Sequence, residues 1–397
     1  MAKVVALTER TIAQRFAEVK DEEGIWGDVG EEVRSVVKRI LEGSLEEELS
    51  MRLGAAPYSR KEGRSGYRNG GYSRSLSTRW GLLDVYMPRA RTRQAPSEVL
   101  GRFQRREAKV DSLVREAFLR GISTREVGDV LEPILGCRPS AQTVSRITRS
   151  LDGEVRRFHW RRLGDDFRYL FLDGVTMAVK HPGGVAKKLV LTAYGVRPDG
   201  TRVLLDFRLA LAESRNAWEA FLEDLFRRGL EGGSLLLIVT DGCPGLASAI
   251  GIVYPRIANQ LCWAHKLRNV AAKLPRRHQE ACLNGARRIY LAANAREAGQ
   301  RFSAWATEWR PIAPRAVSCI GSEMERLTAF FECPAQDWRR VRTTNAIERS
   351  FREVRRRTKP MSCFQNNSSC ERIIYAVISH LNQRWSKTTA PKITQLS

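Results

Sequence analysis

The stretch that decides the fold is YLFLDGVTMAVK at residues 169–180, which is followed by KLVLTAYG at 188–195 and RVLLDFR at 202–208. Each run is rich in the β-branched and aromatic side chains that favour strands. The turn sequences HPGG and RPDG separate the runs. Three strand-like runs joined by short turns predict an antiparallel meander.

Helical and strand patterns alternate after this meander. Residues 217–226 have the period of an amphipathic helix, and the apolar run at 235–239 is typical of a strand buried on both faces. The next expected elements are a helix at 244–250, a short strand at 257–262 and a helix at 264–274. We therefore expect an α/β fold with the order β-β-β-α-β-α-β-α, and a strandless helical stretch at 275–340.

Three further helices and a connecting helix at 151–164 are predicted upstream, and the first of the three has an apolar face from Val110 to Leu119 that ends before Gly121. Ser123 and Glu126 have the spacing of a capping box, which would start a helix over about 124–134. Ser140, after the turn LGCRP, is placed to cap the next helix. The polar side chains of that helix expected to contact DNA are Gln142, Thr143, Ser145 and Arg146. This layout is typical of a helix-turn-helix reader, although small three-helix units also occur without DNA.

The charge balance indicates a polyanionic partner. The 397 residues include 67 Lys and Arg against 44 Asp and Glu, a formal net charge of +23. Because this charge is distributed rather than gathered on one amphipathic helix, nucleic acid fits better than a membrane. No window approaches the ~20 apolar residues of a membrane span. The first residues lack the pattern of a secretory signal, so we expect a cytoplasmic, nucleoid-associated protein with reduced cysteines.

The charge is unevenly spread along the chain. Residues 1–51 hold twelve acidic and seven basic side chains, a net charge of −5, whereas residues 52–109 hold four acidic and fourteen basic ones, a net charge of +10. The basic segment mixes Gly, Ser, Tyr and Arg and has one short strand pattern near 82–87. It predicts a DNA-binding arm, and the alternative is a solvated, partly disordered linker. The arm arginines expected to contact DNA are Arg68, Arg74, Arg89 and Arg91.

Two carboxylates follow apolar runs at comparable places. Asp173 ends the run YLFL and Asp241 ends LLLIVT, and each precedes a glycine. Converging at one edge of a sheet, they would form the oxygen-rich site that Mg²⁺ prefers, although either could simply cap the following turn. A third carboxylate is expected from the helix at 344–358, where Glu348 and Glu353 lie about 500° apart and cannot both face one site. The arginines of this helix expected to hold the DNA backbone include Arg349, Arg352 and Arg356.

These blocks together resemble a known family. LFLDGVTMAVK, TDGCPGLASAI, NQLCWAHKLRNV and TTNAIERSFREVRRRTK follow the order of blocks in bacterial Mutator-type insertion-sequence transposases, and the likeness covers roughly residues 30–385. The resemblance implies an RNase H-like catalytic core interrupted by an all-helical insertion and preceded by a helical, helix-turn-helix DNA-binding region. It also implies a DDE triad of Asp173, Asp241 and Glu348 that binds Mg²⁺, with Mn²⁺ able to substitute.

A Cys-x-x-His motif lies between the second and third acids. Cys262 and His265 are followed by His278 and Cys282, so a zinc site is one interpretation. The continuous helical pattern between the two pairs argues against it. We expect instead that Cys262 is a core residue and that His265 is catalytic, either near the scissile phosphate or hydrogen-bonded to an active-site carboxylate.

The expected function is that of a transposase. It would bind the terminal inverted repeats of its element and target DNA, cleave and transfer strands, and work as a homodimer or higher homo-oligomer with no membrane partner. The alternatives are a non-catalytic DNA-binding regulator derived from a transposase and a nuclease that does not join strands. The expected domains are an acidic assembly segment at 1–51, the arm at 52–109, the helix-turn-helix domain at 110–165, the core at 166–274, the insertion at 275–340 and the last core helices and tail at 341–397.

Overall fold

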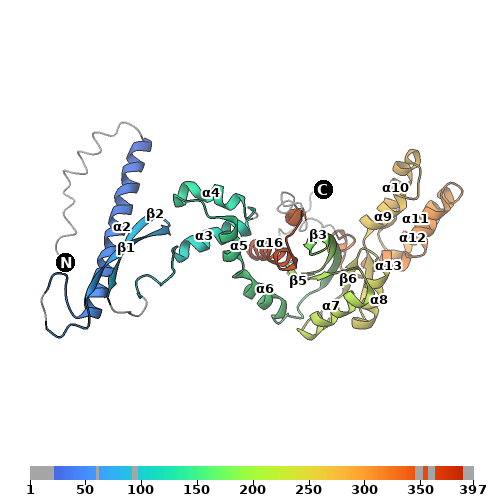
Figure 1. Cartoon of the computed structure of the whole chain (residues 1–397). Coiled ribbons are helices and arrows are strands. Elements are labelled where there is room, and N and C mark those ends of the chain that lie inside the picture. The colour runs from blue at the N-terminus through green and yellow to red at the C-terminus, as the bar shows by residue number, and fades with distance from the viewer. Residues whose placement is uncertain are drawn as a thin grey trace. The chain divides into compact units, whose positions relative to one another are not determined.

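The computed structural model describes residues 22–59, 62–91, 97–120, 122–344, 352–355 and 363–387. The chain divides into two compact units (Figure 1). The first comprises residues 1–118 and 122–149, and the second comprises residues 119–121 and 150–397. Within the described chain, no helix is long and apolar enough to cross a membrane.

A long helix and a β-hairpin form the first part of unit one. Helix α2 (Glu22–Leu53) packs against strands β1 (Arg68–Thr78) and β2 (Gly81–Ala90), which pair antiparallel. Alternate β2 side chains are buried, among them Leu83 and Val85, because a strand directs successive side chains to opposite faces. Their core also contains Leu45, Leu76 and Leu100.

This hairpin argues against the alternative interpretation of the basic segment as a partly disordered linker, and it corrects the expected number of strands. The sequence pattern indicated one short strand at 82–87, but the structure has two long ones. Strand β1, RNGGYSRSLST, has too few apolar residues to be recognised as a strand by itself. It is held by backbone pairing to β2, for example Leu76 opposite Leu83, and by burial of its last residues against α2.

Three short helices complete unit one: α3 (Ala108–Leu119), α4 (Glu126–Leu135) and α5 (Ala141–Thr148). The predicted capping box is confirmed, because Glu126 N donates to Ser123 Oγ at 3.2 Å and Ser123 N donates to Glu126 Oε2 at 3.4 Å. Ser140 caps α5 as predicted, since its Oγ accepts from Thr143 N at 3.2 Å.

Unit two is built on a five-stranded mixed sheet. Its strands are β3 (Tyr169–His181), β4 (Gly184–Val196), β5 (Arg202–Ala210), β6 (Leu237–Thr240) and β7 (Ala258–Leu261). The spatial order is β5-β4-β3-β6-β7. The predicted meander of β3, β4 and β5 is antiparallel, whereas β6 and β7 run parallel to β3. A mixed sheet with this alternation of helices confirms the α/β class.

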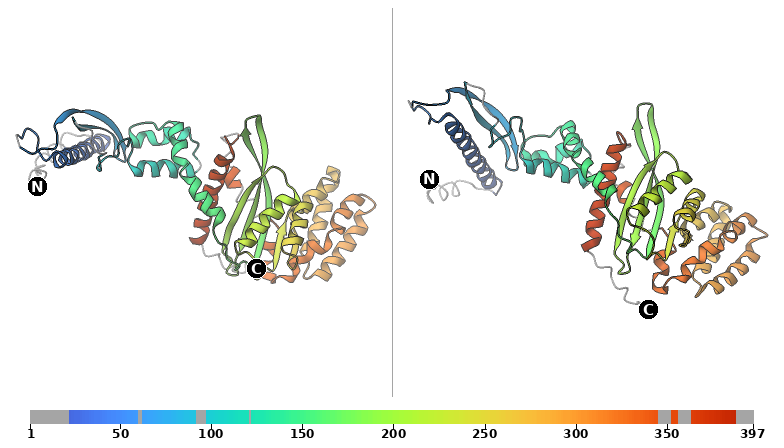
Figure 2. Two further views of the ribbon diagram at one scale, coloured as in Figure 1. Left: turned by 60° about the horizontal axis from the view of Figure 1, so that its bottom comes forward. Right: turned by 90° about the horizontal axis from the view of Figure 1, so that it is seen from below.

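Helices cover both faces of this sheet (Figure 2). On one face, α7 (Arg215–Arg227) and α8 (Pro244–Val253) bury a core that includes Leu172 and Trp218. The other face carries α6 (Leu151–Trp160) and α16 (Asn367–Lys387). These helices meet it through ring contacts, with Phe158 of α6 beside Phe207 and Trp385 of α16 beside Tyr194.

A helical segment follows β7. Its α-helices are α9 (Trp263–Ala271), α10 (Arg276–Tyr290), α11 (Ala295–Trp309), α12 (Pro314–Gly321), α13 (Met324–Thr328) and α14 (Trp338–Val341). No strand occurs in residues 263–344, as the sequence indicated. Trp305 and Trp309 are both buried, and Trp305 Nε1 donates to Cys282 O at 3.0 Å. These tryptophans therefore pack between helices of the segment.

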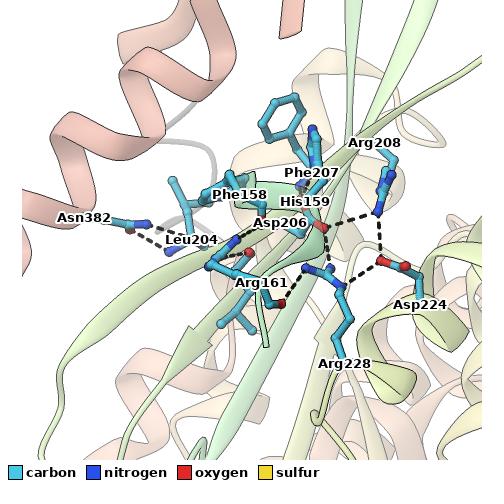
Figure 3. A network of polar contacts seen from close by, with 11 residues as sticks. Phe158, His159, Arg161, Leu204, Asp206, Phe207, Arg208, Asp224, Arg228 and Asn382 are labelled. Atoms are coloured by element: carbon cyan, nitrogen blue, oxygen red, sulfur yellow. Dashed lines mark hydrogen bonds and ion pairs between the residues drawn. The ribbon is translucent and has the colours of Figure 1, made fainter. Parts of the chain in front are cut away.

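A buried polar network joins α6 to β5 and α7 (Figure 3). At its centre, the carboxylate of Asp206 is fully buried. Its Oδ1 lies 2.6 Å from His159 Nδ1, and its Oδ2 pairs with Arg228. Asp224 Oδ2 extends the network, at 3.0 Å from Arg228 Nε and 2.9 Å from Arg208 Nη2. Because a buried carboxylate is costly to desolvate unless it is paired, Asp206 depends on Arg228 and on the contact with His159, and the latter links α6 to the sheet.

Candidate active site

Of the two aspartates predicted to form the site, Asp173 lies on β3 and Asp241 directly follows the adjacent parallel strand β6. Strands β3 and β6 pair in the register Leu170 with Ile238 and Phe171 with Val239. The pairing ends at Phe171 and Val239, and each of these residues lies two positions before an aspartate. Asp173 and Asp241 therefore follow the end of the β3/β6 pairing by the same number of residues, with Asp241 at the point where β6 ends.

Asp173 lies inside a strand. It follows the apolar run YLFL, and β3 continues through it to His181, as the strand-like run at 169–180 predicted. The strand continues because β4 pairs with it along its whole length, with Asp173 opposite Thr192. Near Asp173, only the parallel pairing with β6 ends. The sheet edge at the candidate site is therefore formed by the end of the short strand β6, because β3 continues past it.

Asp173 faces the side of the sheet that carries α16. Its neighbour Leu172 belongs to the core under α7 and α8, and successive strand residues point to opposite faces. The Asp173 side chain is only 6% exposed. A carboxylate at such a depth requires hydrogen bonds or a cation, because desolvation of its charge is costly.

Asp241 also makes a turn contact. Its Oδ1 accepts a hydrogen bond from Cys243 N at 3.1 Å, just before α8 begins at Pro244. One oxygen of the Asp241 carboxylate therefore caps the following turn, as the alternative interpretation expected. The side chain of Asp241 is half-buried and follows β6. The neighbouring strand β7 is joined to β6 at its end, where Cys262 N donates a hydrogen bond to Thr240 O at 2.8 Å.

Three residues cluster at the carboxyl end of β7. Thr344 N and Thr344 Oγ1 lie 3.2 and 3.4 Å from Cys262 Sγ, and Thr344 Oγ1 lies 3.4 Å from His265 Nδ1. Cys262 and Thr344 are buried. The sequence analysis missed Thr344, although it lies in the quoted block TTNAIERS. Its contacts fix the start of the chain segment that leads to Glu348.

Both titratable groups of this cluster are perturbed. Hydrogen bonding to Cys262 raises the pKa of His265 against the effect of burial, and the charges of Cys262 and Asp173 raise it further. Burial alone would raise the pKa of Cys262, but hydrogen bonds to His265 and Thr344 outweigh it, so this pKa is lowered. The dependence of the His265 pKa on Asp173 indicates that the cluster and the first aspartate share one electrostatic environment.

The zinc interpretation finds no support in the described chain. Cys262 and His265 contact Thr344, whereas Cys282 packs with Trp305 on the helical segment. The described residues contain no group of three or more His, Cys, Asp and Glu side chains able to hold a metal ion. Glu348 is not one of the described residues.

The helix predicted to carry the third acid is described only at 352–355. There, Val354 is buried and Arg352 is exposed, while Glu353 is half-buried and has a partner. Glu348, Arg349 and Arg356 lie outside the described residues.

The predicted DNA-contact residues of the hairpin divide into two groups. Arg68 donates to Glu46, Ser50 and Ala55, and Arg74 donates to Gly101, Arg102 and Tyr72. These guanidinium groups serve internal contacts. Arg89 and Arg91 are exposed, with Arg89 lying over the Tyr72 ring at 4.1 Å.

The predicted reading helix presents its polar side chains as expected. Gln142 and Arg146 of α5 are exposed, and Thr143 and Ser145 are half-buried. Val144 and Ile147 anchor the opposite side of the helix in the core of unit one.

Comparison with known proteins identifies the family. The family model described as "Transposase, Mutator family" matches residues 7–388. The chain belongs to the Mutator family of transposases. Curated relatives of this family member include the transposase for insertion sequence element ISRM5 of Rhizobium meliloti (strain 1021), which is 36% identical over 89% of this chain and 88% of that protein.

Two further relatives support the same family. The transposase for insertion sequence element IS905 of Lactococcus lactis subsp. lactis (strain IL1403) is 31% identical over 91% of each chain. The transposase for insertion sequence element IS256 in transposon Tn4001 of Staphylococcus aureus is 30% identical over 89% of this chain and 90% of that protein.

Proposed function

We propose that this chain binds the terminal inverted repeats of an insertion sequence and catalyses DNA cleavage and strand transfer with a DDE triad. The observation that carries the proposal is the β3/β6 register, whose last pair, Phe171 with Val239, lies two residues before each aspartate. The family assignment supports the transposase activity. The sheet order, with three antiparallel strands followed by two parallel ones, supports an RNase H-like core with residues 263–344 as most of its helical insertion.

Asp173, Asp241 and Glu348 would hold the metal ions. The depth of Asp173 and the oxygen-only donor set fit Mg²⁺, with Mn²⁺ as a substitute. When bound, the ions supply neutralisation of the phosphate charge and activation of the attacking oxygen. Thr344 is held beside Cys262 by its backbone N–H. The four residues from Thr344 to Glu348 span at most about 14 Å, which keeps Glu348 near Cys262 and supports it as the third ligand.

The other residues of the chain would bind and orient DNA. His265, whose pKa is raised by its hydrogen bond to Cys262, would attract the scissile phosphate. Gln142 and Arg146 on α5 would read base edges, as in a helix-turn-helix protein. Arg89, Arg91 and the arginines of the segment around Glu348 would contact the phosphate backbone.

The test is cleavage and joining of a plasmid that carries the element ends, in Mg²⁺. Asp173→Asn, Asp241→Asn and Glu348→Gln should each abolish both reactions while binding to the ends persists in a mobility-shift assay. Asp166→Asn is the matched control, because that carboxylate is 56% exposed and pairs with Arg197. Activity in any of the three variants would overturn the triad.

Other outcomes separate the alternatives. If Glu353→Gln abolishes activity and Glu348→Gln does not, the third ligand is Glu353. A wild-type chain that binds the ends and never cleaves them would be a DNA-binding regulator. Cleavage without joining would indicate a nuclease.

A further inference from the structure

An apolar row runs along the N-terminal half of α2. It consists of Val29, Val33, Val36 and Ile40, at spacings of four, three and four residues, which is the a/d spacing of a coiled coil. Val29, Val33 and Ile40 are 39%, 36% and 58% exposed. Trp26 continues the same spacing in the sequence. We call these four described residues the α2 seam.

The hairpin does not cover this seam. The residues of α2 that pack against β1 and β2 include Val37, Leu41 and Leu45, which follow a separate line around the helix. At 100° per residue, the seam residues lie within an arc of about 60° around the helix axis. Leu41 and Leu45 lie roughly 100° or more from the centre of that arc. Figure 1 shows the N-terminal half of α2 extending past the hairpin.

The charges beside the seam indicate which partner fits it. Glu32 and Arg39 flank the seam on one side, seven residues apart and opposite in sign. In an antiparallel pair of identical helices, Glu32 of one copy lies opposite Arg39 of the other, at both ends of the seam. A parallel pair would set Glu32 near Val37 and Arg39 near Ser44, without any charge complementarity.

The apolar layers agree with the antiparallel arrangement. Aligning Val33 with Val36 of a second copy also aligns Val29 with Ile40 of that copy, so every seam residue meets an apolar partner. The surrounding segment suits self-association as well. Residues 1–51 carry a net charge of −5 in a chain whose net charge is +23, so two copies repel one another least here.

We propose that two copies of this chain pair antiparallel through the α2 seam. The seam is short compared with the interfaces of stable dimers, which bury about 1,200–2,000 Å² in total. Pairing is therefore weak without DNA and depends on protein concentration. It would join two end-bound chains, but it does not depend on the assignment of the catalytic triad.

The first test is sedimentation velocity of the full chain without DNA over a range of concentrations. The wild-type chain should show a concentration-dependent monomer–dimer equilibrium, and Ile40→Glu should raise its dissociation constant at least about tenfold by placing a charge in the seam. The matched control is Ile312→Glu, an isoleucine 51% exposed in unit two, which should leave the equilibrium unchanged. Far-UV circular dichroism checks that each variant is folded.

The second test uses charge reversal. Glu32→Arg alone would place Arg opposite Arg39, and Arg39→Glu alone would place Glu opposite Glu32, so each variant should associate more weakly than the wild type. An equimolar mixture of the two variants should regain association, because every contact across the antiparallel pair then joins opposite charges. Neither variant regains its internal Glu32–Arg39 pair on mixing, so recovery reports the contact between chains.

Three results would overturn the proposal. One is a wild-type chain that remains monomeric at all concentrations, as it would if another segment of the same chain covered the seam. Another is association that Ile40→Glu leaves intact. The third is a mixture of the charge variants that associates no better than either variant alone. Loss of plasmid cleavage in the triad variants is measured separately, so failure here and failure of the proposed function are distinguishable.

Discussion

The Asp206 network allows a sharp test of what burial adds to an ion pair. Asp206→Asn keeps the shape of the side chain and removes its charge. The variant would take the fully buried carboxylate away from Arg228, whose side chain is only 9% exposed, and leave it the pair with the 36% exposed Asp224; it would also weaken the contact with His159. Removing one partner of a buried pair costs about 3–5 kcal/mol, because the remaining charge stays desolvated.

The matched comparison is Asp166→Asn. Asp166 Oδ2 lies 2.6 Å from Arg197 Nε, and Asp206 Oδ1 lies the same distance from His159 Nδ1. The side chain of Asp166 is 56% exposed and that of Asp206 is fully buried. Exposed pairs contribute about 0–1 kcal/mol, so the Asp166 variant should unfold almost like the wild type.

Thermal and urea unfolding of the full chain measure this difference. A shift of roughly 2–4 °C in Tm per kcal/mol is expected for a unit of this size, so Asp206→Asn should lower the Tm of unit two by roughly 6–20 °C. Tryptophan fluorescence follows that unit through Trp218, which is buried in the core of its sheet. Equal shifts for both variants, or a loss below about 1 kcal/mol for Asp206→Asn, would refute the reasoning that burial decides the strength of the pair.

Three further predictions concern other parts of the chain. Thr344→Val removes the hydroxyl beside Cys262 and should slow strand joining about five- to tenfold, with recovery in Thr344→Ser, as measured by joining kinetics. Arg146→Ala should reduce discrimination between element ends and random DNA about tenfold, as measured by binding titrations of both DNAs at one salt concentration. Burial raises the pKa of Cys282 to about 11, so at pH 8 iodoacetamide should label the half-buried Cys319 well before Cys282, and mass spectrometry gives the order. Cys282 labelled as fast as Cys319 would contradict the third prediction.

Local patterns in the sequence predicted the elements that depend on nearby residues. The caps at Ser123 and Ser140 were correct because a cap is a contact between residues three apart. The predicted order of strands and helices along the sheet domain was also correct, because a long apolar run is by itself a signal of a buried strand or helix. Strand β1 was missed because its few apolar side chains become buried only when α2 and β2 are beside it.

The candidate site also combines residues that a local pattern indicates with residues that only contacts distant in sequence bring in. The sequence singled out Asp173 and Asp241 from their places after apolar runs, and the register of β3 and β6 ends two residues before each of them. The sequence could not indicate Thr344, because its partners are Cys262, 82 residues away, and His265, 79 residues away. It also assigned Arg74 to DNA, whereas folding turned this side chain toward backbone carbonyls of Gly101 and Arg102.

The sequence by itself determined the α/β class, the family and the net charge of +23, because composition, periodicity and ordered motifs are all written along the chain. Only the tertiary structure decided which of these charged groups meet. It buried Asp206 among His159 and Arg228 and directed Arg68 inward, leaving Arg89 exposed. The physical reason is that the energy of a charge depends on its desolvation and on partners distant in sequence, and both are set when the strands and helices pack.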